Sequence, residues 1–524
     1  MLEEGVRHDD SAGGRARRSV RSILAWLRGV PPEPILVGLG LFLLLAAFVA
    51  ADPASGVSFS SGPYGDEAGN VVNARNFVQL GRWSTDDWNL YLVNVPFSVL
   101  EALAFKLFGV GLVQARLAMV LCVSLAATAL AWGLRGAVGR AYATFAGVAF
   151  AASGLVLFYG RLAFLEDLVV LGLTLGVMVL ARASRLSLRG GVLAGLCFAV
   201  AIGAKPSALF SVIGILLAIG IWGRHDPGVR RWIAASTAVI AVAGLFWALV
   251  IWLPNRAAVA IDVEIWPPYQ WNLTPLALLK SIRTYLAGGN DQLYGMLLGP
   301  LVVLGAAGGV AIAALRRHLG EDEARLAVAA FGWAAVGFGI LMVVSYRPNR
   351  YVVPLVPALA ILACIGLHVT VEWLKGRIGP ATDASSPAAQ PTRDPRGSAR
   401  LVMPLVMAAV LAFSAAPGLA WYAGWARHAT YQLVDIQNQT AASAPAGEMV
   451  AGSHTGLFML TSKSVLVLTG MANAGDMYSK GARWYLAPVD ALPPVGVPAS
   501  AWAARQSSGC VTWRGVTECL YHVP

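Results

Sequence analysis

Long apolar runs separated by short basic loops dominate the pattern of hydrophobic and polar positions in this chain. An α-helix rises about 1.5 Å per residue, so about 20 apolar residues cross a hydrocarbon core about 30 Å thick. The runs therefore predict membrane-spanning helices. Eleven segments fit this description: Pro34–Ala50, Leu112–Leu134, Ala141–Tyr159, Asp167–Ala183, Gly190–Ala204, Ser207–Trp222, Trp232–Leu253, Tyr294–Leu315, Leu326–Ser345, Tyr351–Val371 and Leu401–Tyr422.

Arginine and lysine orient the multi-span domain, residues 34–423. Cytoplasmic loops of membrane proteins carry an excess of these residues. The N-terminal segment 1–33 is basic and too long and polar for a cleavable signal peptide, so we place it in the cytoplasm. Every second short loop, and the linker 374–400, then lies on the same side. Their basic residues are Arg135, Arg140, Arg182, Arg185, Arg189, Arg224, Arg230, Arg231, Arg316, Arg317, Arg325, Lys375, Arg377, Arg393, Arg396 and Arg400.

Three segments on the opposite side are too long to be simple connections: loop 51–111, loop 254–293 and the tail 424–524. Within the first loop, Pro96–Phe108 is apolar but too short to cross, so we expect a helix that lies at the membrane interface. The tail combines a helical stretch near 429–443 with strand-like runs. It predicts a small extracytoplasmic α/β domain.

The composition supports a membrane protein. Hydrophobic residues make up 57% of the chain and charged residues only 13%, against about 25% charged in a soluble domain. The net charge of +11 falls in the predicted cytoplasmic loops, so no nucleic-acid partner is expected. No spacing of Cys and His indicates zinc. Cys510 and Cys519 lie in the tail, where an oxidising compartment allows a disulfide, although their separation cannot be read from sequence.

Charged side chains near the predicted outward ends of the spans are the candidates for chemistry, because charges at membrane depth are costly. Asp66 and Glu67 stand in the first loop, and Glu166 and Asp167 in a short outward turn. Four cations lie on the same side: Arg161, Lys205, Arg347 and Arg350. A carboxylate can take a proton from an acceptor, and the cations can hold a phosphate as its bond breaks. The pattern predicts transfer of a group carried on a lipid phosphate.

Each of these residues also has a structural interpretation. Acids favour the first turn of a helix, so either acidic pair can simply begin one, and one of Glu166 and Asp167 is expected to do only that. Arg161 and Lys205 can extend to the interface as amphipathic side chains. Two acidic pairs on one side of the membrane nevertheless favour a functional site.

Several motifs resemble the GT-C glycosyltransferases related to protein O-mannosyltransferases and the lipid A aminoarabinose transferase, a group similar to glycosyltransferase family 39. The matching segments occur in order over roughly residues 35–370: Asp66-Glu67-Ala68, Asn73-Ala74-Arg75-Asn76, Gly81-Arg82-Trp83, Lys106-Leu107-Phe108-Gly109, Ala115-Arg116-Leu117, Arg161–Glu166 and Arg350–Pro357. Relatives often carry a basic residue before a double proline in the first loop, where this chain reads Val93-Asn94-Val95-Pro96-Phe97. The resemblance therefore implies a reaction class and leaves the donor sugar open.

This resemblance implies an α-helical polytopic membrane protein with about eleven transmembrane helices, of GT-C type, and a small C-terminal α/β domain. It implies a hexosyl- or pentosyltransferase that moves a sugar from a polyprenyl-phosphate donor to an extracytoplasmic lipid, glycan or protein acceptor, with inversion. Asp66 maps to the general base, and Glu166 to the second acid, with Asp167 as the competing choice. The phosphate-binding cations map to Arg161, Lys205, Arg347 and Arg350.

Two other classes remain as alternatives. A transporter or flippase of lipid-linked sugars would carry acids or broken helices at mid-span and often a repeated half. A non-catalytic envelope assembly protein would not need both acidic pairs. The expected location is the cell membrane, with the site outside the cytoplasm. No cofactor is required, although carboxylates can hold a divalent cation through oxygen ligands.

Overall fold

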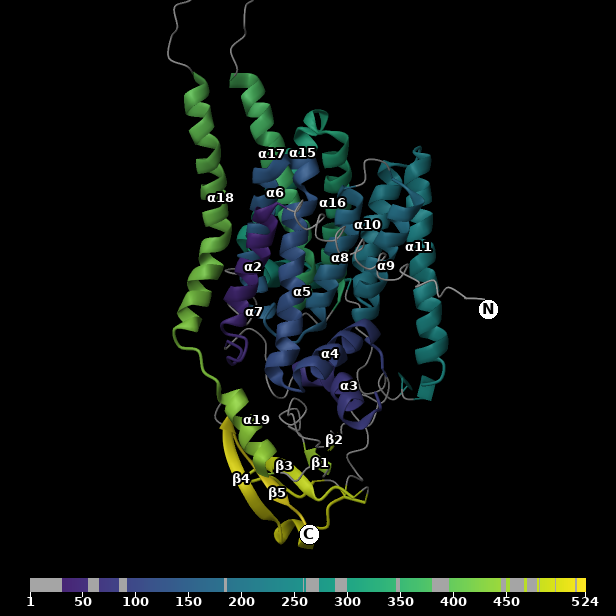
Figure 1. Ribbon diagram of the computed structural model, residues 1–524, viewed down its shortest axis with the longest axis vertical. Coiled ribbons are helices and arrows are strands. Elements are labelled where there is room, and N and C mark those ends of the chain that lie inside the picture. The colour runs from purple at the N-terminus through teal and green to yellow at the C-terminus, as the bar shows by residue number, and fades with distance from the viewer. Residues whose placement is uncertain are drawn as a thin grey trace, which may run out of the picture.

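The computed structural model consists mainly of helices, with a sheet at one end (Figure 1). It describes residues 31–54, 66–83, 92–182, 186–257, 259–260, 273–287, 299–344, 349–378, 395–443, 449–452, 466–468, 478–479, 481–494, 496–513 and 516–524. Helix α18 stands at one edge of the bundle and leads into the C-terminal domain (Figure 1). We call the end of the bundle beside this domain the domain end and the opposite end the basic end.

Each predicted span overlaps helix within the described residues, although Tyr294–Leu298, at the start of one span, lies outside them. The elements are α2 (Pro32–Ala46), α5 (Leu112–Gly133), α6 (Arg135–Ala151), α7 (Gly154–Tyr159), α8 (Leu165–Ala181), α9 (Leu188–Ala204), α10 (Ala208–Trp222), α11 (Pro227–Trp247) with η1 (Ala248–Trp252), α15 (Gly299–Ala314), α16 (Glu321–Val343), η3 (Asn349–Leu355) with α17 (Val356–Ile378), and α18 (Pro395–Ala426). The predicted span over 141–159 is divided between α6 and α7 at Ala152 and Ser153, which are not helical. Shorter helices are α13 (Pro275–Ala287) and η2 (Arg316–His318).

The described helices are those of a multi-pass membrane protein. Five helical stretches are long and apolar enough to cross a bilayer: Leu112–Gly133, Pro227–Trp252, Glu321–Val343, Asn349–Arg377 and Leu405–Ala426. Four shorter apolar helices accompany them: Pro32–Ala46, Leu188–Ala204, Ala208–Trp222 and Pro300–Ala314. The count of about eleven crossings stays a prediction.

Glycines let neighbouring helices approach closely. A Cβ atom built on Gly214 of α10 would overlap the carbonyl oxygen of Gly332 in α16, and the reverse substitution meets the Gly214 oxygen. Gly308 of α15 and Gly366 of α17 make a similar backbone contact. Small residues commonly allow such approach between helices in membranes, where packing drives association. Other residues of α10 and α16 line the pocket described below.

Helices α3 (Asp66–Leu80) and α4 (Val95–Phe108) lie between the bundle and the sheet (Figure 1). Helix α4 is the segment predicted to lie at the membrane interface. Val99, Leu103 and Leu107, spaced four residues apart, leave more than half of their surface exposed along one side. Phe97 and Phe105 are buried on another side. Helix α4 therefore has an apolar side that is not covered by the protein.

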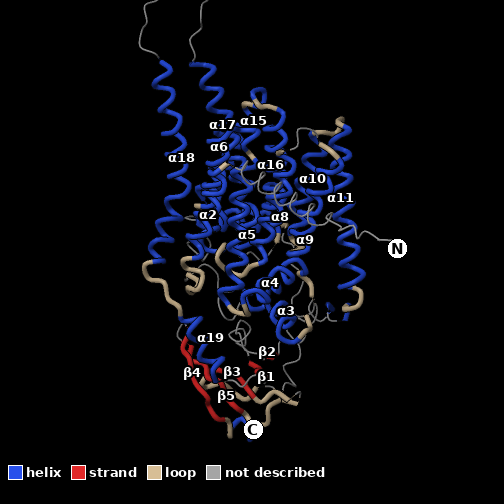
Figure 2. Tube along the Cα trace, in the orientation of Figure 1, coloured by secondary structure: helices blue, strands red, loops and turns tan. Residues whose placement is uncertain are grey.

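The C-terminal domain is a mixed five-stranded sheet with order β2-β1-β3-β5-β4, and the described strands are confined to it (Figure 2). Its elements are α19 (Gln432–Ser443), β1 (Met449–Gly452), β2 (Leu466–Leu468), β3 (Trp484–Pro488), α21 (Ala499–Ala503), β4 (Gln506–Trp513) and β5 (Val516–His522). β1 runs parallel to β2 and β3, whereas β5 is antiparallel to β3 and β4. Cys510 and Cys519, whose pairing the sequence left open, form a disulfide between β4 and β5.

Candidate active site

Three side chains from distant parts of the sequence form a buried ionic cluster at the domain end. Glu166 lies in the first turn of α8, Lys205 directly follows α9, and Arg350 belongs to η3. Lys205 Nζ donates a hydrogen bond to Glu166 Oε1 at 2.5 Å, and Arg350 Nε lies 3.3 Å from the same oxygen. The three side chains are 2%, 13% and 7% exposed, in the order Glu166, Lys205, Arg350. We call them the Glu166 cluster.

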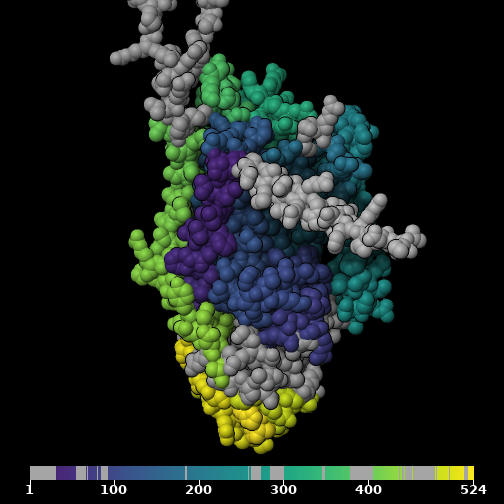
Figure 3. Space-filling view, viewed as in Figure 1, coloured from purple at the N-terminus to yellow at the C-terminus, as the bar shows by residue number. Residues whose placement is uncertain are grey.

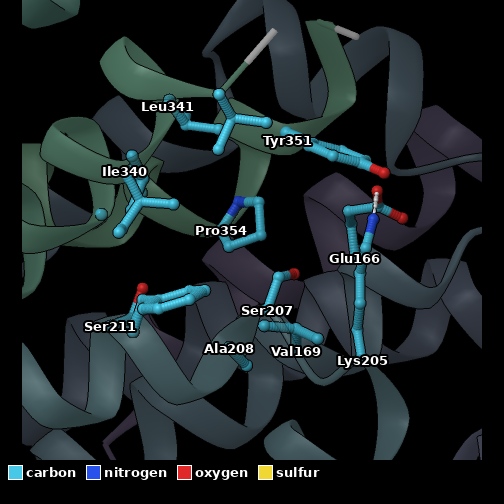
Figure 4. A pocket seen from close by; sticks show the side chains of 14 residues that line it. Glu166, Val169, Lys205, Ser207, Ala208, Ser211, Ile340, Leu341, Tyr351 and Pro354 are labelled. Carbon is cyan, nitrogen blue, oxygen red and sulfur yellow. Dashed lines mark hydrogen bonds and ion pairs between the residues drawn. The ribbon is translucent and has the colours of Figure 1, made fainter. Parts of the chain in front are cut away.

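Aromatic rings hold the two cations of the Glu166 cluster in place. Lys205 Nζ lies 3.7 Å from the centre of the Tyr351 ring. The Arg350 guanidinium carbon lies 5.2 Å from the ring centre of Phe164 and 5.6 Å from that of Tyr351. Cations are attracted to aromatic faces at such distances, most strongly where water is excluded. In Figure 4 the lysine reaches Glu166 with the Tyr351 ring beside the pair.

A pocket of about 100 Å³ adjoins the Glu166 cluster. Glu166, Lys205 and Tyr351 give it one polar side (Figure 4). The remaining wall is mainly apolar and comes from α8, α10, α16 and η3, through residues that include Val169, Ala208, Ile340, Leu341 and Pro354. A ligand that suits this pocket therefore combines a charged group with an apolar chain.

Glu67 forms a second buried network with Arg116 of α5. Arg116 Nε and Nη2 each donate to one Glu67 oxygen at 2.8 Å, and the Ala163 N–H donates to Glu67 Oε1 at 2.9 Å. Arg116 Nη1 donates to the carbonyl oxygens of Val49 and Ala51, each at 2.8 Å. Charged bidentate pairs of this kind are among the strong hydrogen bonds. The network joins α3 to α5 and to the turn before α8.

The ion pair sets the charge of Glu67. Burial alone would raise the pKa of this carboxyl, but the charge and hydrogen bonds of Arg116, with the Ala163 N–H, bring the pKa below its usual value. Glu67 is therefore ionised at neutral pH and fully occupied by its partners. This geometry suits a residue that positions its neighbour Asp66, which begins α3.

Arg161 contacts the start of the first loop. Its Nη1 and Nη2 donate to the carbonyl oxygens of Ala51 and Asp52, each at 2.8 Å, and its guanidinium carbon lies 4.2 Å from the centre of the Trp425 ring. Arg161 does not line the pocket beside the Glu166 cluster. Its predicted contact with a phosphate stays a prediction, and the described contacts are those of a positioning residue.

Asp52 connects the first loop to the C-terminal domain. Its carboxylate accepts hydrogen bonds from the N–H groups of Gln432 and Leu433, each at 2.9 Å, and from Thr430 Oγ1 at 2.5 Å. The Asp52 N–H in turn donates to the Thr430 carbonyl at 2.8 Å. The carboxylate therefore caps the N-terminus of α19. This role could not be predicted, because Asp52 and its partner Gln432 are separated by 380 positions in the chain.

Two further acids are buried with no hydrogen-bond partner among the described residues. The carboxylate oxygens of Asp167 in α8 and Glu101 in α4 have no hydrogen-bond partner within the described part of the chain, and both side chains are fully buried. Burial, followed by the charge of Glu67, raises the pKa of Glu101 well above its usual value. Sequence reasoning missed Glu101, although an acid within a short apolar helix is a usable signal.

The remaining predicted residues are described only in part or not at all. The backbone of Asp66 begins α3, but its side chain lies outside the described residues, as does the whole of Arg347. The predicted separation of less than about 10 Å between Asp66 and Glu166, set by hydrogen bonding to one substrate, therefore stays a prediction. Within the described ranges, no group of three His, Cys, Asp or Glu residues could hold a metal ion.

The fold is similar to that of solved GT-C glycosyltransferases. ArnT from Cupriavidus metallidurans bound to undecaprenyl phosphate shares 18% sequence identity at a TM-score of 0.60, covering 93% of this chain and 98% of that one. The archaeal oligosaccharyltransferase AglB from Archaeoglobus fulgidus, in complex with an inhibitory peptide and a dolichol-phosphate, shares 12% sequence identity at a TM-score of 0.52. The match covers 86% of this chain and 69% of that one. The arabinofuranosyltransferase AftD from Mycobacteria shares 16% sequence identity at a TM-score of 0.53. That match covers 94% of this chain and 40% of that one.

These likenesses show that the chain has the GT-C fold and confirm the resemblance predicted from its motifs at the level of the fold. Neither a protein-family model nor a curated protein sequence matches the chain.

Proposed function

We propose that this protein is a glycosyltransferase that moves a sugar from a polyprenyl-phosphate donor to an acceptor outside the cytoplasm. The observation that carries the proposal is the Glu166 cluster: Glu166 and Lys205 line a pocket with an apolar wall, and Arg350 lies 3.3 Å from the Glu166 oxygen that binds Lys205. The fold supports it, because the similar ArnT structure contains undecaprenyl phosphate and the AglB structure a dolichol-phosphate. The distribution of arginine supports an orientation with the basic end in the cytoplasm.

Lys205 and Arg350 are the proposed phosphate ligands, with Arg347 as a third from outside the described residues. Both side chains are largely buried and fixed by Glu166 and by aromatic rings, so they need little rearrangement when an anion arrives. Preorganised cations stabilise the negative charge that develops on a leaving phosphate. The apolar wall formed by α10 and α16 suits the first part of a polyprenyl chain.

Asp66 is the proposed general base. The acceptor oxygen or nitrogen attacks the sugar carbon that bears the phosphate, its proton passes to the Asp66 carboxylate, and the carbon–oxygen bond to the phosphate breaks with inversion. The electrons of that bond leave with the polyprenyl phosphate. Glu67, held by Arg116 and Ala163, fixes the first turn of α3 and so the place from which Asp66 acts. Glu166 orients the phosphate ligands, with Asp167 as the competing choice for the second acid.

Release of labelled sugar from polyprenyl phosphate tests the proposal. Purified protein is incubated with a panel of radiolabelled polyprenyl-phosphate sugars and a membrane extract as acceptor source. We expect transfer by the wild type, loss of at least about a hundredfold in Asp66→Asn, as for removal of a general base, and normal transfer in Asp490→Asn, which changes an exposed acid of the C-terminal domain.

Two results would contradict the proposal. Wild-type rates in Asp66→Asn would remove Asp66 as the base. Movement of intact lipid-linked sugar across vesicles without cleavage of any donor in the panel would favour the flippase alternative.

A further inference from the structure

A long groove lies on the bundle surface, away from the Glu166 cluster. It has a volume of about 470 Å³, and its walls come from α2, α6 and α18. Its lining is apolar apart from Glu33 and Thr144, with Leu36, Leu41, Val148 and Leu419 among the contributing residues. Figure 3 shows α2 and α18 side by side on this face of the molecule. A volume of several hundred cubic ångströms is that of a small-molecule site.

The groove extends over about half of a membrane. Along α2 it reaches from Glu33 to Leu44, a rise of about 16 Å for a helix, which is about the depth of one leaflet of a hydrocarbon core about 30 Å thick. At its far end the Tyr422 hydroxyl of α18 donates to the Leu44 carbonyl oxygen at 3.4 Å. Helices α18 and α2 are therefore hydrogen-bonded at the end of the groove toward the domain end, and Glu33 lines its other end, at the basic end.

The mouth of the groove at the basic end is positively charged. Glu33 is paired with Arg135 at 3.3 Å and also with Arg140, so two guanidinium groups share one carboxylate there. The Arg140 side chain is 67% exposed and can reach a further anion. Basic side chains at a membrane surface attract anionic lipid head groups.

We infer that this groove binds an anionic glycerophospholipid of the leaflet at the basic end, with an acyl chain along α2, α6 and α18 and its head group at Arg140 and Arg135. This is the cytoplasmic leaflet if the proposed orientation holds, and the inference does not depend on sugar transfer. The bound lipid would fill the space between α18 and the bundle and so support the helix that leads to the C-terminal domain.

Gly40 provides a direct way to fill the groove. It lines the groove, and a Cβ atom built on it meets nothing within 4 Å. Gly40→Leu therefore adds an apolar side chain to the space without a clash in the protein. Gly244→Leu is the matched control, because Gly244 of α11 is also exposed, also has nothing within 4 Å and does not line the groove.

Native mass spectrometry of the purified full-length protein tests the inference. The protein is mixed with equal amounts of dioleoylphosphatidylglycerol and dioleoylphosphatidylcholine. We expect one retained phosphatidylglycerol, a loss of about fivefold in its retention in Arg140→Gln, a comparable loss in Gly40→Leu, and no loss in Gly244→Leu. Asp66→Asn should retain the lipid fully, which separates this result from failure of the proposed function.

Three outcomes would overturn the inference. Equal retention of the two lipids in every variant would show that no head-group site exists. Displacement of phosphatidylglycerol by undecaprenyl phosphate would assign the groove to the donor chain. A dimer of the wild type that is lost in Gly40→Leu would assign it to a second copy of the protein.

Discussion

Buried carboxylates at the domain end differ in whether they have a partner. Glu67 and Glu166 each meet an arginine or lysine, whereas Glu101 and Asp167 meet none within the described part of the chain. Burial raises the pKa of Glu101 well above its usual value, whereas in Glu67 the charge and hydrogen bonds of Arg116 outweigh burial and lower the pKa. Acids that look alike in sequence therefore differ in charge and in their response to substitution.

We expect Glu67→Gln to lower the free energy of unfolding by about 3–5 kcal/mol, because it leaves the buried charge of Arg116 uncompensated. The reference is Glu372→Gln, which breaks an exposed ion pair with Lys375 and should cost less than about 1 kcal/mol. Chemical denaturation of the purified protein measures both. An equal decrease in the free energy of unfolding in the two variants would show that the Glu67–Arg116 pair stabilises the protein no more than the exposed pair does.

Glu101→Gln, in contrast to Glu67→Gln, should not lower the stability of the folded protein at low pH. The pKa of Glu101 is higher in the folded protein than in the unfolded chain. Between these two pKa values the folded state binds more protons than the unfolded state, so the contribution of Glu101 to wild-type stability falls as the pH rises. Glu101→Gln, which mimics the protonated acid, should unfold near the wild-type temperature at pH 5 and remove part of the fall at higher pH. Thermal unfolding from pH 5 to 9 measures this. A parallel pH profile for both proteins would contradict it.

At the scale of elements, apolar runs and basic loops were sufficient to predict the long apolar helices of the described ranges, but they did not predict α3 and α13, which lie in the two long loops. Breaks in the apolar helices were not predictable, because Ala152 and Ser153, which divide α6 from α7, are small residues that occur freely inside helices. The sequence also indicated that Glu166, Lys205 and Arg350 belong to one site, since all three lie on the predicted outward side of the membrane. It could not pair Glu67 with Arg116, because partners 49 residues apart follow from packing and not from periodicity.

Close packing of α10 against α16 gives a prediction at this scale. Gly332→Val should lower the free energy of unfolding by about 1–3 kcal/mol, since the added side chain overpacks the backbone of Gly214. It should also slow sugar release, because both helices line the pocket. Gly339→Val on the same helix meets nothing within 4 Å and serves as the control. Equal unfolding midpoints for the two variants would show that the contact tolerates a side chain.

At the scale of the molecule, one hydrogen-bonded path runs from the first loop into the C-terminal domain. Arg116 and Arg161 both bind the Ala51 carbonyl oxygen, Arg161 also binds the Asp52 carbonyl, and the Asp52 carboxylate caps α19. The C-terminal domain is thereby joined to the same loop segment that the Glu67 network fixes. Apolar packing joins the two parts as well, because Leu433, Leu486 and Leu520 belong to the same core cluster as the bundle residues.

Asp52→Ala should loosen this connection. Loss of the cap should cost about 0.5–2 kcal/mol, and amide hydrogen exchange should increase in α19 while the exchange of α5 stays unchanged. Asp435→Ala, which removes an exposed acid from the first turn of α19 without touching the cap, is the comparison. Faster amide hydrogen exchange throughout the bundle, or an unchanged exchange rate in α19, would contradict the proposal that Asp52 acts as a local cap.

The cross-strand link in the tail carries information about where the protein resides. Disulfides are rare in the reducing cytosol. The oxidation state of Cys510 and Cys519 therefore indicates whether the tail lies in an oxidising compartment. Only Cys122, Cys197 and Cys364 are free thiols in this structure, whereas the chain contains five cysteines. A chain whose tail has left the cytoplasm therefore accepts three alkyl groups when denatured without reductant, and one whose tail has remained there accepts five.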